Sequence, residues 1–227
     1  MSAVPGMDHL VVVADSLVQG ADWCERTLGV TPGPGGEHPL MGTHNRLLRI
    51  ATVDHPQAYF EIIARNPAAT APGRTRWFDM DQPAQQSAVR EHGPRLVHWV
   101  ARVPDLDAAL AAWRRLGLDR GEAIAASRET ARGLLRWRIG VRPDGQRLLD
   151  GCLPTLIEWT GPHPAANMPE SGIALHALAL QHPQAGLLGR ALSAIGIARV
   201  AVAEGPANLC ATLRTPKGAV RLESSGL

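Results

Sequence analysis

The chain is poor in several residue types that mark particular classes of protein. Its 227 residues include only three cysteines, Cys24, Cys152 and Cys210, and no two of them form a Cys-x-x-Cys pair. We therefore expect neither a disulfide framework nor a thiolate zinc site, and a reducing, cytoplasmic setting fits. Lysine is nearly absent, since Lys217 is the only one, and the formal net charge is +2. Without a basic tract, neither nucleic acid nor a membrane surface is expected as the main partner.

Long apolar runs are also missing. The longest ones are far shorter than the roughly 20 residues that a membrane-spanning helix needs, and the N-terminus does not resemble a signal peptide. We therefore expect a soluble, cytoplasmic protein. What the chain does have is 45% hydrophobic residues, which over this length is enough to build a sizeable core.

An apolar strand pattern that contains a histidine occurs three times. An amphipathic stretch follows each one and ends in a hydrophobic residue and a glycine. The pairs are His9 and Gly29, His98 and Gly117, and His176 and Gly196, which lie 20, 19 and 20 residues apart. A fixed spacing inside a unit of this size indicates an internal repeat.

Each repeat also ends with a glutamate inside an apolar strand pattern, namely Glu61, Glu158 and Glu223. Glutamate is depleted in strands and is rarely buried unless it is paired or bound. A metal is one cause of such a pattern, because imidazole plus carboxylate is an ordinary donor set for divalent Fe, Mn, Ni, Co or Zn.

These patterns predict an α+β protein made of three βαβββ units, over residues 7–65, 95–160 and 172–227. The first unit has an expected helix up to residue 28 and strands over 46–51 and 58–64. The second has a helix over 106–116 and strands over 133–141 and 155–160. Residues 66–94 connect the two, with a short helix over 83–91. Because the third unit has no mate, it packs on the first two or on another chain, which makes a homodimer plausible.

Four segments resemble the vicinal oxygen chelate superfamily, which includes glyoxalase I and extradiol dioxygenases, and above all its glyoxalase-like domain proteins. They span residues 7–11, 41–47, 59–62 and 153–159. The resemblance implies that the first two units pair into an open barrel whose first and last strands hold a metal. Carried over position by position, the ligands are His9, Glu61, His98 and Glu158. The alternative is a former metal site whose residues hydrogen-bond one another or water.

The resemblance also implies an activity. It predicts a metal-dependent lyase or isomerase acting on a small oxygenated metabolite or thiol conjugate, in which the metal stabilises an enediolate. Glu158, or Glu61 by pseudo-symmetry, is then the catalytic base. Asn45, Arg49 and Trp137 are the predicted substrate-binding residues. Two alternatives remain open, an iron-dependent extradiol-type dioxygenase and a metal-free protein that binds a drug or toxin.

Overall fold

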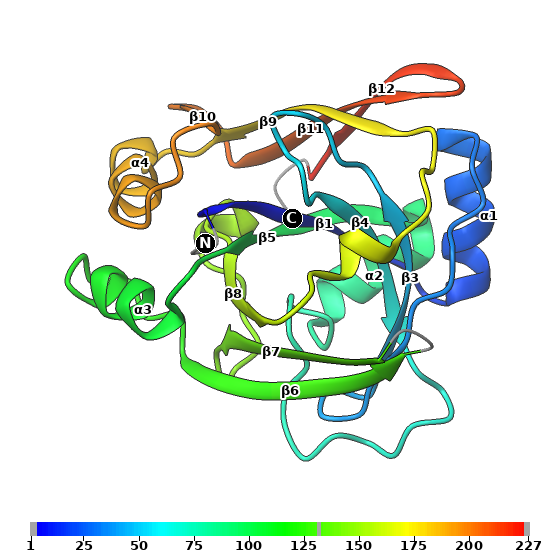
Figure 1. Ribbon diagram of the computed structural model, residues 1–227, viewed down its shortest axis with the longest axis horizontal. Coiled ribbons are helices and arrows are strands. Elements are labelled where there is room, and N and C mark those ends of the chain that lie inside the picture. The colour runs from blue at the N-terminus through cyan, green and yellow to red at the C-terminus, as the bar shows by residue number, and fades with distance from the viewer. Residues whose placement is uncertain (1–3, 131–132, 225–227) are drawn as a thin grey trace.

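The computed structural model describes residues 4–130 and 133–224 and arranges them in two β-sheets flanked by four α-helices (Figure 1). One sheet has eight strands in the order β2-β3-β4-β1-β5-β8-β7-β6, and the other has four in the order β10-β9-β11-β12. The eight-stranded sheet curls into an open barrel. This confirms the predicted α+β class and the joining of the first two units in one barrel.

The two barrel segments share one order of elements and one pattern of strand pairing. The first contains β1 (Gly6–Val13), α1 (Leu17–Leu28), β2 (Glu37–His38), β3 (Thr43–Arg49) and β4 (Tyr59–Arg65). The second contains β5 (Arg95–Arg102), α3 (Leu106–Arg114), β6 (Glu122–Thr130), β7 (Gly133–Val141) and β8 (Thr155–Thr160). In each segment the first strand pairs in parallel with the last, and β1 pairs antiparallel with β5. The barrel is therefore joined through its two first strands.

Local sequence explains where the barrel helices begin and end. The side chains of Ser16 and Asp105 accept hydrogen bonds from backbone N–H groups in the first turns of α1 and α3, as good N-caps do. The repeated glycines Gly29, Gly117 and Gly196 have φ angles of 78°, 77° and 76°. This left-handed conformation ends a helix and suits a residue without a Cβ atom. The fixed histidine-to-glycine spacing thus measures one strand plus one helix.

The third segment repeats the order of elements but not the pairing. It contains β9 (Ala174–Gln181), α4 (Ala185–Ala194), β10 (Ala201–Ala203), β11 (Asn208–Thr215) and β12 (Gly218–Glu223). Here the first strand, β9, pairs with β10 and β11, while the last strand, β12, lies at the sheet edge. The segment therefore does not form a third copy of the barrel half.

Strand β1 is buried on both faces and links the two sheets. Its inward side chains are His9, Val11 and Val13, the face that the alternation predicted. Its outward side chains, Leu10 and Val12, share an apolar core with residues of β9, β11 and α4. The third segment thus packs on the first two, and Figure 1 shows its sheet lying over the barrel. A second chain is not needed to cover it, and the homodimer stays a prediction.

The connection between the barrel segments fills the barrel from one end. It contains α2 (Pro83–His92), which confirms the helix predicted over 83–91, and it places Trp77 and Phe78 in the inner apolar cluster. Asp79 anchors this turn, because its carboxylate accepts a hydrogen bond of 2.7 Å from Nε of Arg147. Short 3₁₀ turns follow at η1 (Leu149–Gly151) and η2 (Pro164–Asn167). No helix in the described parts of the chain is long and apolar enough to cross a membrane.

The predicted βαβββ unit requires a strand between its helix and residues 133–141, but the sequence did not locate it; in the structure it is β6. Its nine residues include three alanines and three charged side chains, which favour strands little. It forms because it pairs with β7 at nine consecutive positions through a hairpin. Tertiary pairing, and not local preference, therefore decides its conformation.

We expect the contact between the two sheets to carry much of the stability of the protein. Leu209 of β11 is fully buried in the shared core, so Leu209→Ala should lower the free energy of unfolding by about 2–5 kcal/mol. Leu40 is 47% exposed, and the matched change Leu40→Ala should cost less than about 0.5 kcal/mol. Urea denaturation of both variants measures the difference. Equal losses would show that the four-stranded sheet is not packed on the barrel as described.

Candidate functional site

Asp8 is the buried centre of a hydrogen-bond network inside the barrel. A β-bulge interrupts the pairing of β1 with β5 between Met7 and His9. The Asp8 carboxylate accepts hydrogen bonds from Nδ1 of His9 at 2.7 Å, Nε1 of Trp159 at 3.0 Å and Nε2 of His163 at 2.9 Å. Burial by itself would raise the pKa of Asp8, but the hydrogen bonds from His163 and His9 bring this pKa below its usual value. Asp8 therefore stays ionised.

The network fixes the orientation of His9. Because a carboxylate can only accept, Nδ1 of His9 carries a hydrogen, and Nε2 is left facing the cavity. The imidazole also stacks on Tyr59, with 4.4 Å between ring centroids. Burial, with Asp8 and Glu61 close by, raises the pKa of the Tyr59 hydroxyl well above its usual value. Tyr59 thus remains a neutral neighbour.

Glu61 faces the exposed nitrogen of His9. Its Oε2 atom lies 3.6 Å from Nε2 of His9, and its Oε1 atom accepts a hydrogen bond of 2.6 Å from the Asn45 amide. Asn45 is held in turn, since its Oδ1 accepts a 2.8 Å hydrogen bond from the backbone of Gly36. Asn45 therefore orients the Glu61 carboxylate, which is 5% exposed.

These groups open into a small inner cavity of about 40 Å³. Its polar lining consists of His9, His38, Asn45, Glu61 and Arg128, and its aromatic lining consists of Tyr59, Trp77, Phe78, Trp137 and Trp159. Burial, with Arg128 and His9 nearby, lowers the pKa of His38 to about 3, so His38 is neutral. The predicted residues Asn45 and Trp137 are thus at the site.

Arg49 lies elsewhere. It lines a larger outer groove beside the inner cavity and forms an ion pair with Glu170, at 3.3 Å. The sequence predicted that it would share a pocket with Asn45, on the same strand. The strand runs past the cavity, however, and carries Arg49 beyond its rim.

His98 lies inside the barrel, but both of its ring nitrogens are engaged by the protein. Its Nδ1 donates to the carbonyl oxygen of Gly151, and its Nε2 accepts from the backbone N–H of Thr155, both at 3.0 Å. Burial and the nearby Arg120 lower its pKa well below the usual value, so the ring is neutral. The Phe78 ring, at 5.2 Å, lines the cavity in its place. With its Nε2 lone pair occupied, His98 is not free to ligate a metal.

Glu158 points out of the barrel. Its Oε2 atom accepts a hydrogen bond of 2.8 Å from the backbone N–H of Leu106, at the start of α3, and lies 3.6 Å from Arg138. Its neighbours Ile157 and Trp159 face the interior. The sequence analysis predicted that Glu158 faces the interior, but in the structure its two neighbours along the strand do so instead. Because the strand is apolar on both sides of Glu158, its pattern does not reveal which face is inward.

The predicted metal quartet therefore does not come together, which corrects the assignment of His98 and Glu158 as ligands. His9 and Glu61 meet, but His98 and Glu158 are turned to backbone partners. No group of three or more His, Cys, Asp or Glu side chains within residues 4–130 and 133–224 is arranged to hold a metal ion. Of the four predicted ligands, one imidazole and one carboxylate line the cavity, which does not fit the four-ligand site that the resemblance implied.

The third repeat forms no site either. His176 is exposed on β9, and Glu223, at the end of the edge strand β12, pairs with Arg221 at 2.6 Å. The sequence analysis also missed four polar groups of the barrel site, namely Asp8, His38, His163 and Arg128. The Asp8-His9 pair was visible at the opening of the first strand. His38 and His163 come from proline-rich segments, and Arg128 comes from strand β6, which the sequence did not locate.

We predict that His98 is structural. His98→Ala would leave the Gly151 carbonyl and the Thr155 N–H without partners, so it should cost about 2–5 kcal/mol of unfolding free energy in urea denaturation. His98→Gln keeps a donor and an acceptor and should restore part of this loss.

The same variants differ in their response to pH. His98 is neutral when folded and gains a proton when unfolded below about pH 6.5. The wild type should therefore lose stability as the pH falls below that value, and His98→Gln should lose less. A His98→Ala variant as stable as the wild type would contradict this structural role.

Comparisons with known proteins agree with the fold. The sequence matches the family described as the glyoxalase-like domain over residues 7–196. A search of curated proteins found no significant match.

Solved structures give a similar answer. A hypothetical protein from Staphylococcus aureus has a TM-score of 0.57 at 13% identity, covering 97% of this chain and 85% of that one. A variant of Streptomyces coelicolor methylmalonyl-CoA epimerase, in complex with 2-nitronate-propionyl-CoA, has a TM-score of 0.45 at 16% identity, covering 71% and 99%. The Mycobacterium tuberculosis methylmalonyl-CoA epimerase has a TM-score of 0.39 at 18% identity, covering 71% and 91%. Of these three, the first supports the fold.

The family match spans well over half of the chain, and the barrel is the one that the resemblance implied. The chain therefore belongs to the glyoxalase-like domain family of the vicinal oxygen chelate superfamily.

Proposed function

We propose that the protein is a glyoxalase-like lyase or isomerase that moves a proton on a small oxygenated metabolite. The observation that carries this proposal is the row formed by Asp8, His9 and Glu61, which ends at the inner cavity. A buried carboxylate and an imidazole nitrogen 3.6 Å apart form an acid–base pair. The Asp8 carboxylate behind His9 accepts a hydrogen bond from its Nδ1 atom and orients the ring.

In the proposed reaction Glu61 is the base. Its carboxylate takes a proton from the carbon next to a carbonyl group, so that the C–H bond breaks and an O–H bond forms on Glu61. The electron pair moves to the carbonyl oxygen and gives an enolate. Return of the proton to another face or another carbon completes an isomerisation, and loss of a neighbouring group completes an elimination. Asn45 keeps the carboxylate turned toward the cavity.

His9 acts on the oxygen in this proposal. In its protonated form, His9 can donate a hydrogen bond from Nε2 to the developing enolate, while Asp8 holds the ring in place. The aromatic lining excludes water from the cavity, which strengthens such a hydrogen bond. The negative charge that develops on the enolate oxygen is therefore stabilised by one oriented hydrogen-bond donor, the Nε2–H group of His9.

A metal-free binding protein is the second candidate. The aromatic side chains Trp77, Phe78, Trp137 and Trp159 line the cavity, and such walls suit a flat or apolar ligand. The dioxygenase alternative has less support, because the second histidine that the resemblance assigns to iron, His98, bonds to Thr155 instead.

The test compares two glutamates. We expect the wild type to catalyse exchange of α-protons for deuterium in a panel of small 2-oxo aldehydes, 2-oxo acids and 2-hydroxy acids, followed by proton NMR. Glu61→Gln removes the base and should slow this exchange by about 10²–10⁴-fold. Glu158→Gln is the matched control and should keep near-wild-type exchange, because its side chain lies outside the barrel. An equal loss in both variants would contradict the assignment of Glu61, and no exchange with any compound would favour the binding protein.

A metal measurement follows from the same geometry. We expect that any transition metal that copurifies with the untagged protein will be lost in His9→Ala and kept in His98→Ala, because of these two histidines only His9 lines the cavity. Elemental analysis of the three proteins measures the stoichiometry. Loss of the metal in a folded His98→Ala variant would restore the original quartet.

A further inference from the structure

A large groove lies outside the inner cavity, along the open seam of the barrel. It has a volume of about 590 Å³ and is lined by the loop after α1, by β3, by the β6–β7 hairpin and by the η2 turn. The eight-stranded sheet ends at β2 on one side and at β6 on the other, and Figure 1 shows the β6–β7 hairpin reaching toward β3. The groove therefore lies where the barrel fails to close.

The groove and the inner cavity adjoin. Leu47, Arg128 and Pro164 line both of them. The inner cavity, at about 40 Å³, has room for a few water-sized groups, whereas the groove is in the range of small-molecule sites. A substrate that reaches Glu61 can thus place only a small reacting end inside, and its remaining atoms must lie in the groove.

Arg128 stands at this junction without a partner of its own. Its Nε atom is buried and makes no hydrogen bond, and among the described residues no carboxylate forms an ion pair with it. The other arginine of the groove, Arg49, is paired with Glu170. A second arginine of the hairpin, Arg138, is paired with Asp107 at 2.9 Å. Of the two arginines that line the groove within the described residues, Arg128 is thus the one without a carboxylate partner.

The surroundings hold Arg128 in place. Its guanidinium packs on Gly36, where a Cβ atom would collide with it. A confined guanidinium lacking a partner is costly unless an anion binds it, and its fork of donors matches a carboxylate or a phosphate. The remaining lining of the groove is largely apolar, with Val30, Leu48, Leu135 and Met168 among its residues.

We propose that Arg128 binds an anionic group of the substrate at the junction of cavity and groove, with an apolar tail extending along the groove. The proposal deepens the proposed function, on which it rests for the identity of the reacting end. It defines the substrate class as a carboxylate or phosphate that has its anion close to the reacting carbon and an apolar body on the other side.

The test measures binding and needs no turnover. Hexanoate, hexyl phosphate and the neutral hexanamide have tails of similar length, and their binding is followed by the fluorescence of the cavity tryptophans. We expect at least one anion to bind the wild type about tenfold or more tightly than hexanamide, since hydrogen bonds to charged groups are the strong ones. Tighter binding of hexanoate would identify the anion as a carboxylate, and tighter binding of hexyl phosphate as a phosphate.

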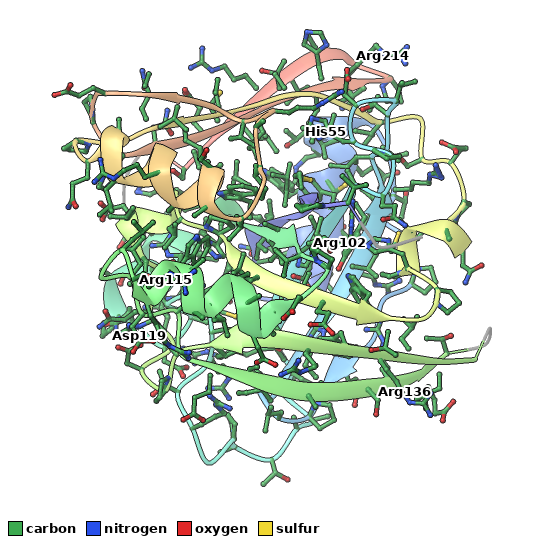
Figure 2. The ribbon with its side chains drawn as sticks, turned by 60° about the vertical axis from the view of Figure 1, so that its left-hand side comes forward. His55, Arg102, Arg115, Asp119, Arg136 and Arg214 are labelled. Carbon is green, nitrogen blue, oxygen red and sulfur yellow. The ribbon has the colours of Figure 1, made fainter. Side chains whose placement is uncertain are left out.

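Arg128→Gln should remove this preference and leave hexanamide binding unchanged. Arg136→Gln is the matched control, because Arg136 lies on the same hairpin but is exposed, and Figure 2 shows it at the outer surface. Failure of both anions to bind, equal binding of anion and amide, or equal loss in the two variants would overturn the proposal. Proton exchange by the wild type would still stand in those cases, so failure here is distinct from failure of Glu61 as the base.

Discussion

The antiparallel pairing of β1 with β5 is the constraint on which the rest of the structure depends. It joins the two barrel halves, and it places two first strands at the centre of the eight-stranded sheet, where both of their faces are buried. The outer face forms the core beneath the third segment. The inner face carries His9. A bulge in this pairing brings Asp8 into hydrogen-bond contact with the His9 ring, and the candidate site is organised around that pair.

Two charged side chains near the cavity, the buried Asp8 and the half-buried Arg128, have opposite surroundings. Asp8 is fully enclosed and receives three hydrogen bonds, with Arg102 also 4.0 Å away. Figure 2 shows Arg102 in the interior, while Arg115 and Asp119 lie near the surface. A buried carboxylate satisfied in this manner is a fixed part of the scaffold. Arg128 receives no such compensation from the described residues, and this contrast is why we assign to it an external anion.

The two halves of the barrel have diverged in what fills their interiors. In the first half Glu61, Asn45 and His9 keep polar atoms at the cavity. In the second half, the Phe78 ring packs against His98, and Arg120 and Thr155 form hydrogen bonds with Nε2 of its imidazole. His98 and Glu158 occupy the sequence positions that the resemblance assigns to ligands, but only the first half presents such donors to the cavity. The two halves therefore share a backbone arrangement but differ in the polar side chains that they present to the cavity.

The sequence by itself determined the repeated strand-helix-glycine units, the two joined barrel halves, and the roles of His9 and Val11 on one face of their strand. The repeats and the shared strand face follow from local rules, namely the period of two in a strand and the left-handed glycine that ends a helix. The joining of the barrel halves is what the family resemblance implied. The sequence could not determine that Glu158 points outward, because Leu156, Ile157 and Trp159 are apolar on both faces of the strand. Nor could the sequence bring Arg128 to the cavity or His163 to Asp8, since these two residues come from a weakly patterned strand and a proline-rich turn. Only the tertiary structure decides such cases, because a side chain's partners depend on which distant segments pack against its face.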